Sequence, residues 1–179
     1  MKRRHLLAGL ASAGAIGGAG LVATGTVPTL SGGDGPEPVE PTTVETIDAP
    51  GSRDGEVTIP AGDRATFVDF FGTWCDPCIE QMPALAAAED RVDDDVLFVS
   101  VTTEDVGGAV SEETVVEWWR ENDGDWLVAA DTTAELAAKL NVGGYPTAVA
   151  IDADGRVQWS ESGIHTADEL VAGIETARD

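Results

Sequence analysis

Two cysteines, Cys75 and Cys78, are the residues of this 179-residue chain whose spacing most clearly predicts chemistry. A separation of two residues is too short to close a structural loop and is typical of redox-active dithiols. The alternatives are a passive disulfide or half of a metal site. A metal site would need two further ligands, and besides carboxylates only His5 and His165 remain. The pair therefore favours thiol-disulfide chemistry, with no metal and no cofactor.

The segments around the cysteines predict how they are held. The apolar run 65–71 before them predicts a buried strand, and apolar residues at helical spacing predict a helix to about residue 91, kinked at Pro83. A thiol at a helix start lies near unpaired backbone N–H groups and the positive end of the helix dipole, which stabilise a thiolate. We expect an exposed Cys75 to attack a disulfide and Cys78 to resolve the mixed disulfide.

Two aspartates could influence these thiols. Asp69 is the one charged residue in the run 65–71, and burial would raise its pKa toward neutrality, as a general base requires. Strand alternation alone does not assign its face, so a solvent-facing Asp69 is the alternative. Asp76, between the cysteines, opposes a thiolate and raises the pKa of the Cys75 thiol. A less stabilised thiolate makes the pair more reducing, which predicts a reductase.

The rest of the chain predicts one domain of strands and helices. The acidic, Pro- and Gly-rich segment 31–50 is expected to be a disordered linker, and the domain to span 51–179. The expected elements are an edge strand 56–59, a central strand 65–71, the helix after Cys75, a strand 96–101, a helix 111–121 capped by Ser111, a strand 126–129, a short helix with a Thr132–Glu135 capping box, a hairpin of 147–151 and 156–160, and a last helix to about 177 with a Thr166–Glu169 capping box.

The run Val68-Asp-Phe-Phe-Gly-Thr-Trp-Cys-Asp-Pro-Cys78, with Gly144-Tyr-Pro-Thr147 downstream, resembles the thioredoxin superfamily over about 57–177. The segment 103–131, the Pro83 helix and the turn 152–155 resemble its TlpA and ResA branch, which consists of membrane-anchored extracytoplasmic thioredoxins. The resemblance implies an α/β thioredoxin fold, a central mixed β-sheet flanked by helices, with a TlpA-type insert.

The resemblance also implies residue roles. Pro146 matches the family's cis-proline beside the dithiol, which presents the backbone of Tyr145 to an extended substrate; an ordinary trans turn proline is the alternative. Asp69 matches a buried acid that shuttles a proton to or from the resolving thiol. Trp74, with Asp76 and Pro77, would flank the substrate.

Other positions receive weaker predictions. Members of this branch often carry a glutamate where this chain has Gln81, and neighbouring Glu80 lies on another helix face, so that role is not transferred. His165 is expected at the surface. The remaining tryptophans are expected to be core or half-buried packing residues, namely Trp118, Trp119, Trp126 and Trp159.

The N-terminus predicts export. Lys2, Arg3 and Arg4 precede the uncharged stretch 6–27, so 1–30 is expected to be a signal or membrane anchor, of a possible twin-arginine type. Cleavage and retention both remain open, with a lean toward an uncleaved anchor. The enzyme would then act outside the cytoplasm.

The charge excludes one class of partner and indicates an environment. Beyond residue 30 there are 7 basic and 33 acidic residues, a net charge of −26, which repels nucleic acid. Such a balance resembles haloarchaeal proteins, whose high ionic strength screens self-repulsion; a merely acidic protein is the alternative.

The resulting prediction is a monomeric protein-disulfide reductase that exchanges electrons with protein dithiol or disulfide substrates and a membrane or extracytoplasmic donor. Cytochrome c maturation is one possible setting. The alternatives are a redox-inactive thiol-binding chaperone or assembly module, and a peroxide-reducing thioredoxin-fold relative, whose peroxidatic cysteine usually lies in a different motif.

Overall fold

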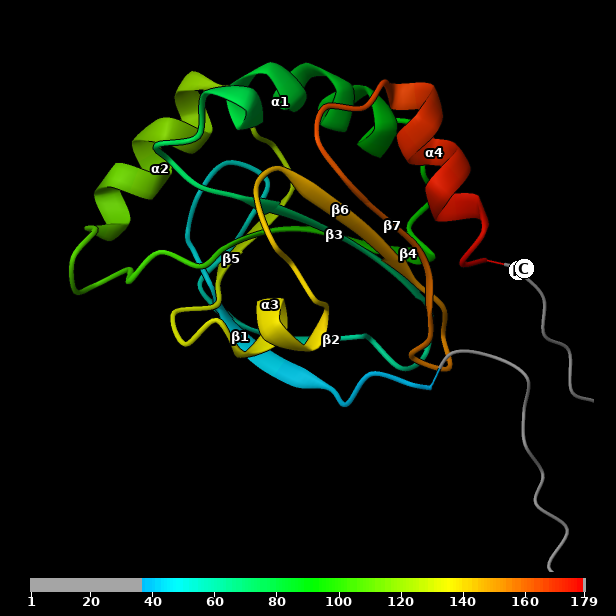
Figure 1. Ribbon diagram of the computed structural model, residues 1–179. Coiled ribbons are helices and arrows are strands. Elements are labelled where there is room, and N and C mark those ends of the chain that lie inside the picture. Colours follow the sequence, from blue (N-terminus) through cyan, green and yellow to red (C-terminus); the bar gives the residue numbers. More distant parts are fainter. Residues whose placement is uncertain (1–36, 179) are drawn as a thin grey trace, which may run out of the picture. The chain divides into compact units, whose positions relative to one another are not determined.

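The computed structural model describes residues 37–178 (Figure 1). The predicted anchor over 1–30 and the first part of the predicted linker lie outside the described residues. The elements are β1 (Thr42–Thr46), β2 (Gly55–Ile59), β3 (Ala65–Phe71), α1 (Asp76–Glu89), β4 (Val96–Thr102), α2 (Glu112–Glu121), β5 (Leu127–Ala130), α3 (Glu135–Lys139), β6 (Thr147–Ile151), β7 (Val157–Ser162) and α4 (Ala167–Glu175).

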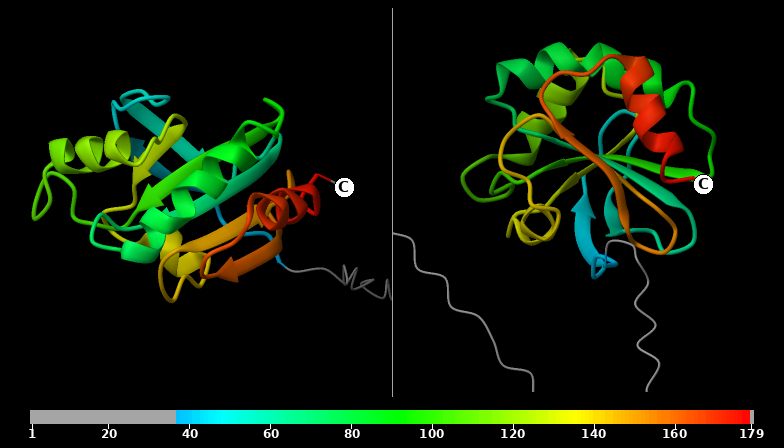
Figure 2. Two further views of the ribbon diagram at one scale, coloured as in Figure 1. Left: turned by 90° about the horizontal axis from the view of Figure 1, so that it is seen from above. Right: turned by 45° about the vertical axis from the view of Figure 1, so that its right-hand side comes forward.

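Seven strands form one mixed sheet in the order β2-β1-β5-β4-β3-β6-β7. β3 pairs in parallel with β4 and antiparallel with β6, and β6 forms the expected hairpin with β7. Helices α1, α2 and α4 cover one face of the sheet and α3 covers the other (Figure 1), and α1 lies across the sheet between α2 and α4 (Figure 2). This arrangement confirms the predicted thioredoxin fold.

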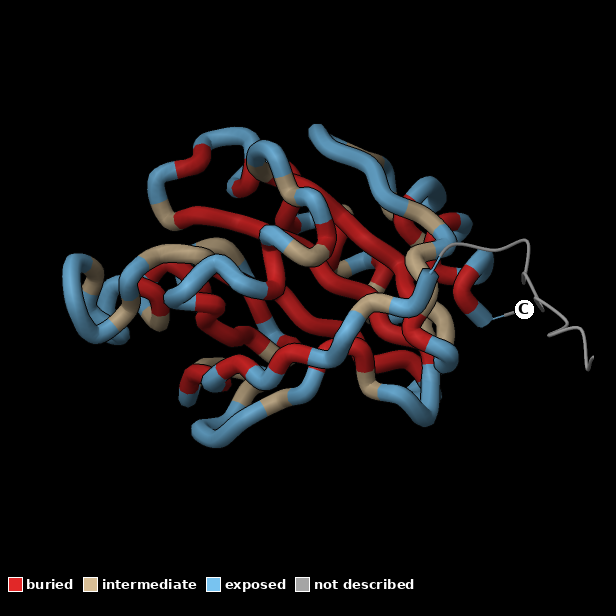
Figure 3. The backbone as a smooth tube through the Cα atoms, turned by 60° about the horizontal axis from the view of Figure 1, so that its bottom comes forward, coloured by how far each residue is buried: buried red, intermediate tan, exposed pale blue. Residues whose placement is uncertain are grey.

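Two apolar cores, one on each face of the sheet, hold the strands in place. The core under α1, α2 and α4 includes Phe67, Phe71 and both cysteines, and the core under α3 includes Val68 and Phe70. Because successive side chains of a strand point to opposite faces, β3 contributes to both cores. β3, β4 and β6 are buried along their whole lengths, which is visible as continuous red tube in Figure 3.

The structure corrects the predicted linker. Residues 42–46 form β1, which pairs with β2 on one side and with β5 on the other, so they are not a disordered tether. Val44 and Ile47 are 5% and 3% exposed. The segment has few apolar residues, but Thr and Val favour strands. In addition, β1 forms backbone hydrogen bonds with a strand on each side, β2 and β5. The domain therefore begins before residue 51.

Most helix boundaries agree with the sequence, and one cap does not. Ser111 caps α2, and the Thr166–Glu169 capping box of α4 is present. The predicted Thr132–Glu135 box is absent: α3 follows Ala134, at a φ of 54°, with no side-chain cap. Instead the Asp131 carboxylate accepts a hydrogen bond from the Ala137 N–H at 2.9 Å. Within the described residues, no helix is long and apolar enough to cross a membrane.

Candidate active site

Cys75 and Cys78 form a disulfide at the N-terminus of α1, with their Cα atoms 5.3 Å apart. Cys75 is the residue that caps the helix, and its sulfur accepts a hydrogen bond from the Cys78 N–H at 3.2 Å. Pro77 lies in the first turn, where a missing N–H costs nothing. The sulfur of Cys75 thus occupies the position where the helix N-terminus stabilises negative charge, as predicted.

The exposure of Cys75 differs from the prediction. In this disulfide form Cys75 is 3% exposed and Cys78 is 2% exposed, so neither sulfur is open to solvent. The sulfurs pack in the core beneath α1 with Met82 and Phe71. The spacing of two residues could not indicate this burial, because it depends on the side chains that pack around the disulfide.

Asp69 lies on the same face of the sheet as the dithiol. It alternates along β3 with Phe67 and Phe71, which share the core of Cys75 and Cys78, and it is 1% exposed. Burial raises the pKa of Asp69 to about 7, and the hydrogen bond from Ser100 opposes this rise. The solvent-facing alternative is therefore excluded. An acid that titrates near neutrality beside a dithiol can accept or return a thiol proton.

The loop before β6 lies beside the dithiol, because its Tyr145 ring contacts Trp74, the residue before Cys75. The Tyr145–Pro146 peptide bond is cis, matching the geometry that the resemblance implies. The ring of Tyr145 meets Trp74 edge to face, with centroids 5.7 Å apart, and its hydroxyl bonds Thr103. Trp74 is 67% exposed, which leaves most of its ring available to a binding partner. Asp76 and Pro77 are also exposed.

Sequence reasoning missed Glu104, which holds the loop in front of Cys75. Its carboxylate accepts hydrogen bonds from the Thr73 N–H and the Thr73 hydroxyl, both at 2.8 Å, and from the Thr102 hydroxyl at 3.0 Å. A single glutamate therefore joins the end of β4 to the turn that carries Trp74. No local pattern marks it, because its partner Thr73 is 31 residues away.

Gln81 has a structural role that the sequence did not suggest. Its side chain is 2% exposed and clamps the backbone of His165, donating to the carbonyl at 3.1 Å and accepting from the N–H at 2.6 Å. The segment before α4 is thereby fastened to α1. His165 is half-buried against Trp159 rather than a free surface residue, which corrects its prediction.

The four buried or half-buried tryptophans behave as predicted. Trp119 is fully buried, and Trp118 and Trp126 are buried with it in the core below α1 and α2. Trp159 packs against that core while remaining partly exposed.

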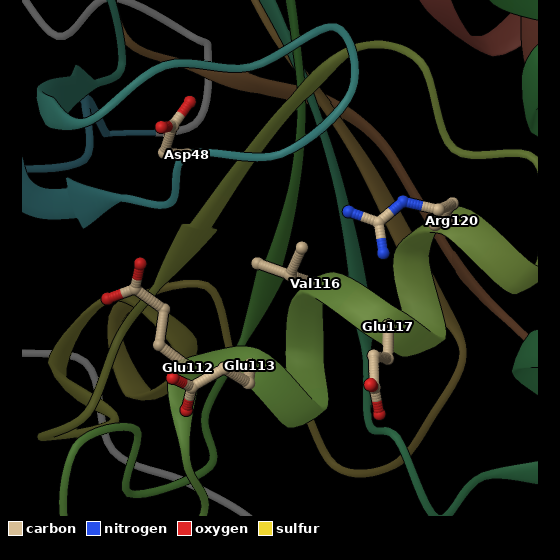
Figure 4. A pocket seen from close by; sticks show the side chains of 6 residues that line it. All are labelled: Asp48, Glu112, Glu113, Val116, Glu117 and Arg120. Atoms are coloured by element: carbon tan, nitrogen blue, oxygen red, sulfur yellow. The ribbon is translucent and has the colours of Figure 1, made fainter.

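A surface hollow beside α2 lies away from the dithiol. This hollow, shown in Figure 4, is bordered by Asp48 and by α2, with Val116 and Arg120 among acidic side chains, and includes neither cysteine. Among residues 37–178 no cluster of three or more His, Cys, Asp or Glu side chains could hold a metal ion.

Comparisons with known proteins identify the family. Residues 53–177 match the Redoxin family. The chain is 23% identical over 116 residues to the sporulation thiol-disulfide oxidoreductase A of Bacillus subtilis and 27% identical over 107 residues to the thiol-disulfide oxidoreductase ResA of Bacillus cereus. These alignments cover 64% and 60% of this chain, and 69% and 60% of those relatives.

Solved structures show the same fold. The crystal structure of StoA from Bacillus subtilis superposes with a TM-score of 0.63 at 21% identity, covering 75% of this chain and 96% of StoA. With a cysteine pair at the start of α1 and a family match over most of the domain, the chain belongs to the Redoxin family and is a thiol-disulfide oxidoreductase of the thioredoxin fold.

Proposed function

We propose that this enzyme reduces protein disulfides outside the cytoplasm, using Cys75 as the nucleophile, Cys78 as the resolving thiol and Asp69 as the acid-base group. The observation that carries the proposal is the Cys75–Cys78 disulfide at the start of α1, over a core that also holds the buried Asp69. The Cys75 thiolate attacks a substrate disulfide, and Cys78 then displaces the reduced substrate. The exchange requires no cofactor.

The direction of electron flow is supported by local charge. Asp76 is exposed between the cysteines, and its carboxylate disfavours the Cys75 thiolate that the helix N-terminus favours. A destabilised thiolate makes the dithiol a better reductant. We expect a reduction potential nearer the roughly −270 mV of thioredoxin than the roughly −120 mV of a strong oxidant. A potential at the oxidising end would overturn the reductase assignment.

The substrate is an extended polypeptide with a disulfide, bound across Trp74 and the Tyr145–Pro146 loop. Exposed Trp74 and the cis peptide bond at Pro146 support this surface. Lys2, Arg3 and Arg4 ahead of an uncharged stretch support export and a membrane anchor, and the acidic composition supports a haloarchaeal-type environment. Apocytochrome c is one client that fits a reductase placed there. We propose that the enzyme acts as a monomer.

Reduction of insulin by the full chain, with dithiothreitol as electron source, tests the catalytic roles. Cys75→Ser should abolish turnover because no nucleophile remains, whereas Cys78→Ser should accumulate a mixed disulfide that Cys75 forms and cannot resolve. Glu117→Gln, an exposed change on α2, serves as the control and should keep full activity.

The same variants decide between enzyme and chaperone. If Cys75→Ser supports client assembly in cells as well as the unmodified chain does, a redox-inactive binding module explains the protein better. Clients captured by Cys78→Ser through a bond that a reductant releases would identify the substrates directly.

A further inference from the structure

Asp69 is the end of a buried hydrogen-bonded chain that crosses three segments of the sheet. The Trp126 indole Nε1 donates to the Ser100 Oγ at 2.9 Å, and the Ser100 hydroxyl donates to the Asp69 Oδ2 at 3.4 Å. Asp69 and Ser100 face each other in the parallel register of β3 and β4, and Trp126 directly precedes β5. Trp126 is 4% exposed, and Ser100 is completely buried.

The direction of these hydrogen bonds follows from the donor chemistry of each group. An indole N–H can only donate, so the Ser100 oxygen must accept from it. The serine has a single proton, and the carboxylate of Asp69 can only accept when ionised. Trp126 therefore orients the hydroxyl so that its proton points at Oδ2. Among the described residues Asp69 Oδ1 has no hydrogen-bond partner.

We propose that Ser100, held in orientation by Trp126, is a positioning residue that occupies Oδ2 of Asp69 and reserves Oδ1 for the exchangeable thiol proton. This inference rests on the proposed role of Asp69 in the dithiol reaction. It assigns different tasks to the two carboxylate oxygens. One is fixed by the protein, and the other is free to accept from Cys78.

In the mixed disulfide the Cys78 thiol gives its proton to Oδ1, and the thiolate attacks the Cys75 sulfur. The Cys75–Cys78 bond forms, and the bond between Cys75 and the substrate sulfur breaks. The leaving substrate thiolate carries away the electron pair and is protonated by Asp69 or by water. The enzyme dithiol is thereby oxidised by two electrons and the substrate disulfide is reduced.

Few other charges face Asp69. Its other neighbour in the sheet is Ala148 of β6, and the titratable groups in or against its core are the two cysteines and the half-buried Tyr145. The second buried carboxylate, Asp131, bonds α3 on the opposite face. The ionisable side chains of the helices that cover this core are exposed or half-exposed: Asp76, Glu80 and Glu89 on α1, Glu112, Glu113, Glu117, Arg120 and Glu121 on α2, and Asp168, Glu169 and Glu175 on α4, with His165 before it. Ser100 is thus the polar contact of Asp69 within the described core.

Trp126 is held tightly enough to act as the anchor. Its ring packs edge to face against Trp119 and Phe98, with ring centroids 4.8 Å and 5.7 Å apart, respectively. Trp119 in turn donates to the Pro50 carbonyl at 3.0 Å. Because these contacts fix the indole plane, the direction of its N–H is fixed too.

A pH titration of the Asp69 carboxyl by carbon-13 NMR tests the inference on the full, oxidised chain, in which the cysteines do not titrate. The Asp69 resonance is identified by its loss in Asp69→Asn. Ser100→Ala should raise the Asp69 midpoint by about one unit, since the ionised form loses its donor. Trp126→Phe should raise it by less, since a freely rotating hydroxyl still bonds Oδ2 part of the time.

Thr66→Val is the matched control. It removes a buried hydroxyl from β3, the strand of Asp69, but on the opposite face of the sheet. It should leave the midpoint unchanged while costing some stability. An unchanged midpoint in both Ser100→Ala and Trp126→Phe would overturn the inference. If Ser100→Ala does not fold, Trp126→Phe and Ser100→Cys provide the comparison.

A kinetic experiment separates this inference from the proposed function. The rate at which the mixed disulfide resolves is measured against pH in single turnovers, and Ser100→Ala should shift the profile to higher pH in parallel with the NMR midpoint. If Asp69→Asn leaves the profile unchanged, the proposed role of Asp69 fails, whereas the NMR titration still judges the placement of Ser100. A purely structural Ser100 would lower stability and move neither readout.

Discussion

At the scale of single residues, the site depends on two polar side chains that lie next to each other in two largely apolar strands. Asp69 interrupts β3 and Ser100 interrupts β4, and the parallel register sets them side by side. Burying a carboxylate with a single hydrogen bond is costly, and the protein meets that cost by raising the pKa of Asp69 to about 7. The same burial lets the Asp69 carboxylate accept or release a proton near neutral pH.

The raised pKa of Asp69 predicts how stability depends on pH. Since the folded pKa of about 7 exceeds the ordinary aspartate pKa of 3.8, the native state binds the proton more tightly than the unfolded chain. The stabilising effect of this protonation is complete below about pH 4 and is lost as the pH rises through 7. Asp69→Asn, which cannot ionise, should remove this fall and be more stable than the unmodified chain above pH 7.

Urea unfolding between pH 5 and pH 8 measures this effect as the difference between the two proteins. The difference should grow by a few kcal/mol, since one unit of pKa corresponds to about 1.4 kcal/mol. Asp131→Asn is not a suitable control because the Asp131 carboxylate holds α3, and Asp152→Asn would disturb a turn. Asp63→Asn, on an exposed loop, avoids both problems. Equal slopes in all three proteins would contradict the shift.

At the scale of elements, the first strand is the least expected part of the domain. β1 lies between β2 and β5 and carries Val44 into the core beneath α3. Without it, β5 would become an exposed edge and β2 would lose its partner. The segment therefore supports the strand order around the site rather than serving only as a tether.

Val44→Ala tests whether β1 contributes to folding. Loss of two buried methyl groups should lower the free energy of unfolding by about 2 kcal/mol. Thr43→Val is the matched control, because Thr43 is exposed on the same strand and valine keeps the strand preference. Chemical denaturation measures both, and a Val44→Ala protein as stable as the control would restore the interpretation of this segment as a linker.

At the scale of the whole molecule, the charge dominates. The chain carries 33 acidic and 10 basic residues, so most acidic side chains have no basic residue available to pair with. Where cations occur they are shared: Arg178 contacts Asp93 at 3.3 Å, Asp95 at 3.0 Å and Glu175 at 2.8 Å. Repulsion among the remaining carboxylates opposes the compact state and weakens with salt.

The melting temperature should therefore rise as KCl is increased from dilute buffer to molar concentrations, where the Debye length falls to about 3 Å. Sucrose is the uncharged control, since it strengthens burial without screening charge. Calorimetry at pH 7 measures both series. A melting temperature that does not respond to KCl would contradict a haloarchaeal-type adaptation.

The sequence by itself determined the fold class, the dithiol, and the candidates Asp69 and Pro146, because each is a local signal: a spacing, a lone charge in an apolar run, or a motif. Ser100 is the same kind of signal in 96–101, and it could have been found by the reasoning that singled out Asp69. The strands β2 to β7 and two helix caps were likewise visible as short patterns.

The tertiary structure decided which face Asp69 occupies, the burial of both sulfurs, the pairing of β1 and the partners of Glu104 and Gln81. These depend on residues that are far apart in the chain, such as Thr73 with Glu104 or Gln81 with His165. Period-two alternation is symmetric between the faces of a strand, and only the packing of α1, which carries the dithiol, makes one of them the active face.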